Sequence, residues 1–303
     1  MAITASMVKE LRELSGAGMM DCKKALTETD GNMEKAVEYL REKGLAKAAK
    51  KAGRIAAEGL VATNISADGK VAAIVEVNSE TDFVAKNETF RTFVANVAAQ
   101  ANATTATDIE AFLAEAWSLE PSKTVADELA SQIAVIGENM SIRRFEKINA
   151  VDGFVESYIH AGGRIGVLVE FTGEATDAAR ECARNVAMQV AAISPKYVDR
   201  SEVSPEYIAH ETEILKAQAM NENPDKPESI IEKMIVGRLN KELKEVCLVD
   251  QVYVKDGDLT VGKYIASVSK DIAVKRFVRF ETGEGIEKKE ENFAEEVAKQ
   301  MGM

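Results

Sequence analysis

The chain has 303 residues, of which 46% are hydrophobic and 29% charged, and its formal net charge is −12. These totals are typical of a globular protein of about two domains and exclude a disordered or membrane-embedded chain. We find neither an apolar stretch of the roughly 20 residues that span a membrane nor an export signal, and expect a cytoplasmic location. The acidic balance disfavours general nucleic-acid binding, and the three dispersed cysteines favour neither disulfides nor a zinc site.

Residues 1–54 are expected to form three short helices followed by a basic tether. The first helix ends at Gly16, and its apolar stripe is Met7, Val8, Leu11 and Leu14. Asn32 is a plausible N-cap of the third helix, which is expected to end at Gly44. The tether, residues 41–54, has six basic residues and one acidic residue. It is most simply a solvated, partly helical segment; contact with an acidic protein surface or a phosphate backbone is the alternative.

An internal repeat is the main guide to the fold. Residues 59–77 align without a gap on residues 153–171, and seven of the nineteen aligned positions are identical. Each copy is expected to form two strands with a turn, at Asp68-Gly69 in the first copy and at Gly162-Gly163 in the second. A helix follows each copy; in the first it is expected to start at Asn87. The fold predicted from this pattern is α+β, with a core of two duplicated subdomains.

The remaining elements are predicted by their apolar spacing. Helical patterns lie at residues 108–117, 124–137, 207–220, 229–243 and 289–301, and strand patterns at residues 246–254 and 272–280 with a turn at Asp256-Gly257. The helices at 207–220 and 229–243 are expected to form a hairpin. Its apolar stripe, which includes Ile230, Ile231 and Ile235, is too long for a lone exposed helix, so we expect it to pack on its neighbour, on a second copy of the chain, or on both.

The expected division of the chain follows from these elements. It comprises a three-helix domain with its tether at 1–54, a first core subdomain at 55–145, a second core subdomain at 146–194 and 245–282, a helical-hairpin insertion at 195–244, and a C-terminal helical module at 283–303.

Thr81, Asp82, Phe83 and Val84, here called the tip, lie between strand and helix in the first copy only. One interpretation places Phe83 in the core of its own repeat, with Asp82 accepting local backbone hydrogen bonds. In the second copy, the connection from strand to helix contains no aromatic residue, and this difference favours the other interpretation. In that one, the ring enters an apolar slot of a partner and the carboxylate repels anions or competes for a cation.

Other candidate contact residues lie in turns. His160 is expected at the exposed end of a hairpin, either simply solvated or in polar contact with a second surface. Met19 and Met20 follow a Gly-Ala-Gly turn, and because adjacent helical residues point about 100° apart, at least one of them is a candidate for exposure.

No assembled catalytic set is visible in the sequence. We find no phosphate-binding GxxxxGK[ST] loop, no GxSxG nucleophile elbow, and no zinc-binding pair around His210. We therefore expect a protein that is not an enzyme and that holds no cofactor and no metal; an enzyme whose site leaves no motif is the alternative.

These residues together resemble translation elongation factor Ts, the guanine-nucleotide exchange factor of elongation factor Tu. The resemblance rests on SGAGMMDCKKAL at 15–26, AAKKAGR at 48–54, EVNSETDFVAKN at 76–87, IGENMSIRR at 136–144, YIHAGGRIGVLVE at 158–170 and RFETGEGIEKKEENFAEEV at 279–297. It covers nearly the whole chain.

The resemblance implies a fold and a function. The three-helix domain would be similar to ubiquitin-associated (UBA) domains, and the insertion would mediate dimerisation. The tip would enter beside the magnesium and phosphate site of elongation factor Tu and promote GDP release, so that GTP can rebind. Contacts with the nucleotide-binding domain fall on Arg12, Met19, Met20 and Lys23, and contacts with more distal domains of the GTPase fall on His160, Gly162 and Gly163.

Two other functions stay open from the sequence alone. One is a non-catalytic RNA- or ribosome-binding adaptor that uses residues 41–54, and the other is an enzyme without a recognisable motif. We expect elongation factor Tu as the partner, a homodimer through residues 195–244, and neither membrane nor direct nucleic-acid contact.

Overall fold

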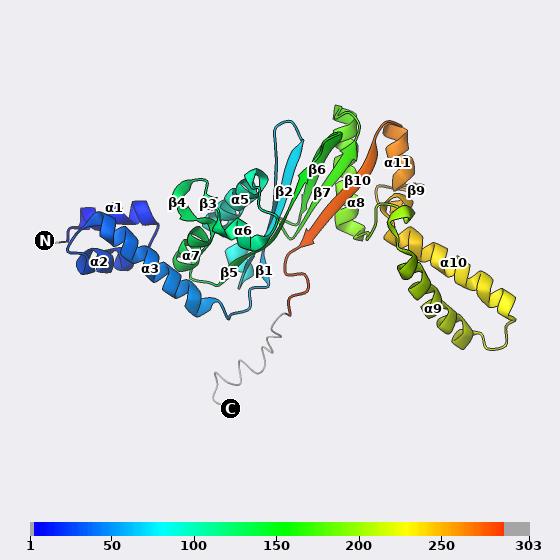
Figure 1. Ribbon diagram of the computed structural model, residues 1–303, viewed down its shortest axis with the longest axis horizontal. Helices are drawn as coiled ribbons and strands as arrows, with labels where there is room; N and C mark the ends of the chain where they lie inside the picture. Colours follow the sequence, from blue (N-terminus) through cyan, green and yellow to red (C-terminus); the bar gives the residue numbers. More distant parts are fainter. Residues whose placement is uncertain (1–2, 288–303) are drawn as a thin grey trace.

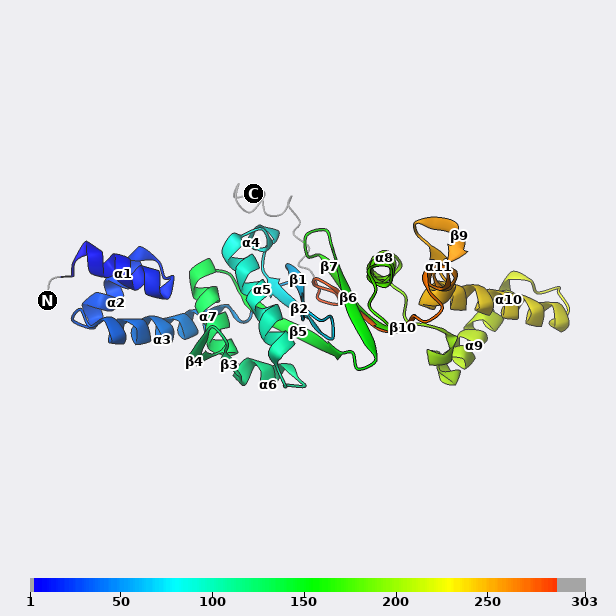
Figure 2. The ribbon, with the colours of Figure 1, turned by 90° about the horizontal axis from the view of Figure 1, so that it is seen from above.

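The computed structural model describes residues 3–287 and shows an elongated molecule of helices and sheets (Figure 1). Three helices lie at one end, a helical hairpin lies at the other, and two antiparallel three-stranded sheets lie between them. Seen from above, the order of layers is helices, first sheet, second sheet, helices (Figure 2). The helix expected at residues 289–301 lies outside the described residues.

The N-terminal helices are α1 (Ala5–Ser15), α2 (Met19–Glu28) and α3 (Met33–Lys51), which confirms the three predicted helices. Gly16 ends α1 at a φ of 66°, a left-handed conformation that favours glycine. The Asn32 side chain accepts a hydrogen bond from the Lys35 N–H and caps α3. A small apolar core joins the helices: Val8, Leu11, Cys22, Ala25, Leu26 and Ala36.

Helix α3 does not end at Gly44 but continues to Lys51, so most of the segment 41–54 is helical and exposed, as predicted for the tether, but it also contacts the core. Gly44 is buried against helix α7 (Val125–Ile136), where a Cβ atom on it would lie 3.6 Å from Ala134 Cβ. Arg41 forms an ion pair with Asp127, and Lys51 Nζ donates to the Gly137 carbonyl. The helix continues through Gly44 because α3 packs on α7 there. Helix α3 therefore connects the N-terminal helices to the core and packs on it.

The two sheets have corresponding strand orders, β1-β2-β5 and β6-β7-β10, with β2 and β7 in the centre. Their strands are β1 (Glu58–Ile65), β2 (Val71–Ser79), β5 (Met140–Asn149), β6 (Gly153–His160), β7 (Ile165–Thr172) and β10 (Ala273–Glu281). Helix α5 (Glu88–Ala103) covers the outer face of the first sheet, and α8 (Asp177–Ile193) covers that of the second. Asn87 caps α5 as predicted. Strand β5 crosses the predicted border at residue 145, because it pairs with β2 along its whole length.

The inner faces of the two sheets meet in reciprocal contacts. The Val61 N–H donates to the Gly163 carbonyl at 2.7 Å, and the Val155 N–H donates to the Gly69 carbonyl at 2.8 Å. The Thr63 and Ser157 hydroxyls, 94 positions apart, lie 3.3 Å from each other. Each hairpin thus holds the turn of the other, and corresponding residues meet across an approximate twofold axis.

A buried carboxylate occupies the same place in each central strand. Glu76 of β2 is fully buried and pairs with Arg143 (Nη1 at 3.1 Å) and Arg144 (Nε at 2.6 Å) of β5. Glu170 of β7 is 1% exposed and pairs with Lys275 and Arg276 of β10, at 2.9 and 2.7 Å. The strand register shifts beside each carboxylate, and the bulge brings two adjacent basic residues within reach of one acid.

Beyond its first helix, each unit contains a small hairpin and a second helix. The first unit has α6 (Ile109–Ala114), β3 (Ala116–Trp117), β4 (Glu120–Thr124) and α7; the second has β8 (Val252–Tyr253), β9 (Asp256–Thr260) and α11 (Val261–Val268). The helix predicted at residues 108–117 stops at Ala114, because the Gln100 side chain binds the Ala116 carbonyl and the Ser118 N–H. Gln189 binds Val252 and Val254 in the same way.

The strand predicted at residues 246–254 is wrong except at β8. Helix α10 reaches Val246, and the 3-10 helix η2 (Leu248–Asp250) follows. The turn of the small hairpin is at residues 254–255, since Asp256 already pairs with Tyr253. The turn predicted at Asp256-Gly257 is therefore wrong.

The insertion is a helical hairpin, as predicted, formed by α9 (Pro205–Glu222) and α10 (Glu228–Val246). A short 3-10 helix, η1 (Arg200–Glu202), precedes it. Ala219 of α9 packs on Ile231 and Ile235 of α10, so part of the apolar stripe is covered by the neighbouring helix.

Candidate partner-binding surfaces

The tip is a single helical turn, α4 (Asp82–Ala85), held between β2 and α5. The Thr81 hydroxyl accepts from the Val84 N–H at 3.4 Å and caps this turn. Val84 is 8% exposed and packs in the core, whereas Phe83 is 79% exposed. The interpretation that placed Phe83 in the core of its own repeat is therefore wrong. Val84 anchors the turn and Phe83 projects from it.

A carboxylate and a cation accompany the exposed ring. Lys86 Nζ donates to Asp82 Oδ2 at 2.7 Å and lies 5.8 Å from the centre of the Phe83 ring. The hydrogen bond from Lys86 holds the pKa of the Asp82 carboxyl below its usual value. Asp82 is thus an anion at neutral pH, with Lys86 as a counter-ion that solvent can replace.

The tip borders an open cleft of about 1030 Å³. Its other walls include the chain before β1, at Arg54 and Ile55, and Arg164 at the start of β7. Ile55 is about half exposed. The cleft therefore extends from the tip of the first unit to the turn of the second.

The three residues predicted as contacts in the β6–β7 turn, His160, Gly162 and Gly163, differ in exposure. His160 is exposed, with Nδ1 3.0 Å from the Tyr158 hydroxyl. Gly162, at a φ of 68°, is exposed and has open space around it. Gly163 is buried, and a Cβ on it would lie 2.7 Å from Leu60 Cδ2. Gly163 therefore joins the two sheets, which leaves His160 and Gly162 for a partner.

An exposed apolar patch lies where α1 meets α2. Met19 is 60% exposed and Met20 is 75% exposed, and Arg12 and Lys23 are exposed beside them. Leu14, which the apolar spacing of α1 placed on one stripe with Val8 and Leu11, is 65% exposed and belongs to this patch. The sequence contained one signal for Leu14, its place in the last helical turn before Gly16. The loop between α1 and α2 lies beside helix α7, where a Cβ on Gly16 would lie 3.9 Å from Val135 Cγ2.

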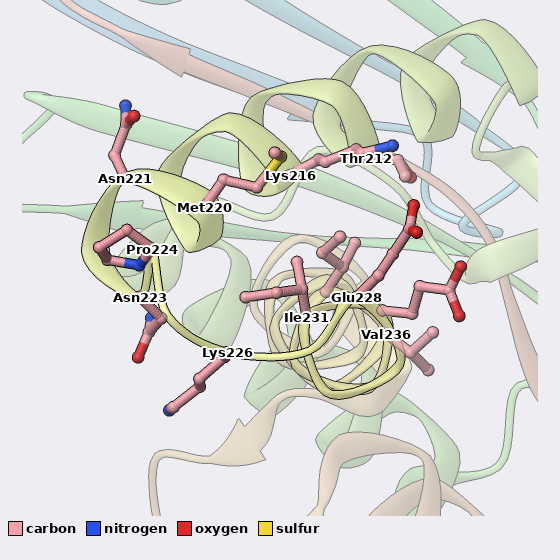
Figure 3. Close-up of a pocket in the computed structure, with 12 residues that line it drawn as sticks. Thr212, Lys216, Met220, Asn221, Asn223, Pro224, Lys226, Glu228, Ile231 and Val236 are labelled. Atoms are coloured by element: carbon pink, nitrogen blue, oxygen red, sulfur yellow. The ribbon is translucent and has the colours of Figure 1, made fainter.

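A second apolar surface lies at the end of the hairpin α9–α10, where side chains of both helices line a groove of about 930 Å³ (Figure 3). Met220 and Val236 are more than half exposed beside it, and Ile230 of the predicted stripe is 41% exposed.

The basic segment 41–54 is largely engaged within the chain. Arg41 binds Asp127, Lys47 binds Asp21 at 2.9 Å, and Arg54 binds Glu80 at 3.4 Å. Lys51 binds the Gly137 carbonyl. Most of its charge is thus used to hold α2, α3 and the core together.

Within residues 3–287, no cluster of three His, Cys, Asp or Glu residues is arranged to hold a metal ion. Cys22, Cys182 and Cys247 are buried, and burial raises the pKa of the Cys182 thiol to about 11. No helix of this part of the chain is long and apolar enough to cross a membrane.

Comparison with known proteins identifies the family. The family model described as Elongation factor TS matches residues 80–284. The chain is 60% identical to elongation factor Ts of Clostridioides difficile (strain 630), 57% to that of Clostridium tetani and 56% to that of Clostridium kluyveri, each alignment covering 99% of both chains. A match of this extent, over the segment that carries the tip, shows that the chain belongs to the elongation factor Ts family.

Proposed function

We propose that this translation elongation factor is a guanine-nucleotide exchange factor. It binds elongation factor Tu in its GDP form, disturbs the magnesium and phosphate site, and promotes GDP release so that GTP can rebind. The observation that carries this proposal is the exposed Phe83 on a turn anchored by the buried Val84. An aromatic ring held out of its own core loses contact with apolar neighbours unless a partner supplies them.

The tip has the chemistry to favour the nucleotide-free partner. An exchange factor works by binding the empty GTPase more tightly than the GDP-bound form. A bound magnesium ion is among the largest charges in such a site, so a carboxylate and a ring inserted beside it change the balance of forces on both metal and phosphates. Asp82 and Phe83 are adjacent, exposed and held in one turn.

The other surfaces supply affinity rather than discrimination. We assign Arg12, Met19, Met20 and Lys23 to contact with the nucleotide-binding domain of elongation factor Tu, and we add Leu14 to this patch. His160 and Gly162 contact more distal domains, and Gly163 shapes their turn. The three N-terminal helices act as a UBA-like domain, the two sheet units as duplicated subdomains, and residues 195–244 as a dimerisation hairpin.

On this proposal the chain is not an enzyme and needs no cofactor, since its effect is on a binding equilibrium. The competing RNA- or ribosome-binding adaptor is disfavoured because Arg41, Lys47 and Lys51 are engaged within the chain. Such an adaptor would show binding that falls steeply with salt and that survives loss of Phe83.

The test is release of labelled GDP from elongation factor Tu. Substoichiometric amounts of this chain should accelerate release in the presence of excess unlabelled nucleotide, with one molecule serving many GTPases. Release at the uncatalysed rate, at every concentration of the chain, contradicts the proposal.

A further inference from the structure

We propose that Glu138 is a positioning residue for the tip: its carboxylate holds Thr81 in the conformation from which Phe83 projects. The kinetic consequence rests on the proposed exchange function. The structural consequence belongs to the isolated chain and can be measured without a partner.

Glu138 binds Thr81 through both carboxylate oxygens. Its Oε2 accepts from the Thr81 N–H at 3.0 Å, and its Oε1 accepts from the Thr81 hydroxyl at 2.7 Å. Both contacts are partly buried, which limits competition from water. A paired hydrogen bond of this kind fixes orientation as well as distance.

Every polar atom of Thr81 is engaged in holding the tip. Besides donating to Glu138, its hydroxyl accepts from the Val84 N–H, and its carbonyl accepts from the Ser79 hydroxyl at 3.1 Å. Helix α4 has four residues, far fewer than an isolated helix needs to form in water. Its geometry must therefore come from the residues that hold its ends.

A second carboxylate, that of Glu80 beside Thr81, binds the backbone of Asn139 beside Glu138. We call these four residues the clasp: Glu80, Thr81, Glu138 and Asn139. Glu80 accepts from the Asn139 N–H, and the Asn139 side chain donates to the Arg54 carbonyl at 2.7 Å. Each of the two neighbouring segments thus places a glutamate on the backbone of the other. The clasp joins the root of the tip to the end of α7, the helix on which α3 packs.

The second repeat contains no such clasp. At the offset of 94 between the copies, Ala175 corresponds to Thr81 and has no hydroxyl. At the offset of 132 that matches Arg144 on Glu76 with Arg276 on Glu170, Lys270 corresponds to Glu138. The chain there passes from β7 to α8 without a helical turn of its own. The clasp therefore occurs together with the tip, as expected if its role is to hold it.

Glu138 is not one of the two exposed tip residues, Asp82 and Phe83, that are proposed to contact the partner. Its loss should therefore act on exchange through Thr81. In Glu138→Ala the tip keeps its residues but samples more conformations. We expect the maximal rate of GDP release to fall roughly tenfold, the loss of one charge-assisted hydrogen-bond pair. The concentration for half-maximal rate should stay within about twofold, since the surfaces that supply affinity are unchanged.

Three variants separate positioning from other roles. Glu138→Gln should retain most of the rate, because its amide oxygen can accept from the Thr81 N–H while its NH2 group donates to the Thr81 hydroxyl. Thr81→Val, which loses only the hydroxyl, should fall between wild type and Glu138→Ala. Glu146→Ala is the matched control, an exposed glutamate on the neighbouring strand β5.

Hydrogen exchange on the isolated chain tests the same point independently. In Glu138→Ala, backbone amides of residues 81–87 should exchange faster than in wild type, whereas those of α5 should keep their protection. Unchanged exchange at 81–87 together with an unchanged maximal rate overturns the proposal. Faster exchange throughout the chain also overturns it, because Glu138 would then be a general stabilising residue. If wild type does not accelerate GDP release at all, the exchange function fails, and hydrogen exchange at 81–87 alone decides whether Glu138 holds the tip.

Discussion

The two halves of the core share one set of helices and strands, here called the frame, and each half carries an element that the other lacks. Each has a three-stranded sheet, a covering helix, a small hairpin and a second helix, and the two frames meet through reciprocal hydrogen bonds. The first half adds α4, with its exposed ring, between the second strand and the helix. The second half makes that passage without a tip and instead carries the hairpin α9–α10 between α8 and β8.

The difference separates residues that build the frame from residues available to a partner. What both halves share is buried and internally bonded, as are Glu76 and Glu170 or Gln100 and Gln189. The features that only one half has, the tip and the hairpin, carry exposed apolar side chains such as Phe83 and Val236. We therefore expect changes to shared features to cost stability, and changes to unshared features to affect binding.

The largest expected effect is on the buried carboxylates. Glu76→Ala leaves Arg143, Arg144 and the buried Gly283 N–H without their acceptor, which should cost about 3 kcal/mol of unfolding free energy. Glu170→Ala should cost less, about 1–2 kcal/mol, because Lys275 and Arg276 are half exposed and regain water. Urea unfolding measures both. A larger loss at Glu170 would break the ranking.

The same carboxylates should make stability depend on pH. Burial opposes ionisation of Glu76, but hydrogen bonds from Gly283, Asn78 and Arg144 outweigh it and hold its pKa below the usual 4.5. The pKa of Glu170 is also lowered, since Lys275 and Arg276 outweigh the effect of burial.

A lowered folded-state pKa gives stability that is present above the unfolded value and lost as the pH falls through the folded value. The urea midpoint should therefore drop as the pH falls below about 4.5, and Glu76→Gln should reduce that drop. An equally steep drop in the variant would show that other carboxylates dominate.

The next effect is on exchange by the tip. Phe83→Ala and Asp82→Ala should each slow catalysed GDP release roughly tenfold, about 1.4 kcal/mol. Stability should change by less than about 0.5 kcal/mol, since both side chains are exposed. Labelled-nucleotide release and urea unfolding measure the two quantities. Unfolding losses of several kcal/mol in Phe83→Ala, as for a core ring, would contradict the division.

The smallest expected effect on exchange comes from the insertion. Replacing residues 213–237 by a short Gly-Ser linker removes the outer hairpin and keeps the cluster of Val203, Leu243 and Cys247 at its base. We expect a monomer by analytical ultracentrifugation, with exchange within about twofold of wild type. Loss of exchange, even at high concentration of the shortened chain, would place the hairpin on the GTPase-binding surface.

Local patterns in the sequence identified the elements with strong end signals. Asn32 and Asn87 marked helix starts, Gly16 marked a helix end, and the alignment of the two copies located four strands. The tip was found because one copy has it and the other does not. The helix-end signals act within a few residues of the feature that they specify, whereas the strands and the tip were found by comparing two segments of the chain.

The errors arose where distant contacts decide the structure. Helix α3 continues past Gly44 because α7 packs there, and the short strands β3 and β8 exist because Gln100 and Gln189 bind their backbones. Glu138 was not identified as a site residue, since it lies 57 positions from Thr81 and follows no local pattern. Tertiary context overrides propensity at such places.

The most direct test of the division between frame and tip is a ratio of affinities. By thermodynamic reciprocity, if this chain weakens GDP and magnesium binding on elongation factor Tu, then GDP with magnesium must weaken binding of this chain by the same factor. Binding to the empty and to the GDP-bound GTPase should be measured for wild type, Phe83→Ala and Met20→Ala. We expect Met20→Ala to weaken both complexes about equally and keep their ratio, and Phe83→Ala to reduce the ratio roughly tenfold. If the two variants change the ratio alike, the tip is an ordinary contact and not the source of exchange.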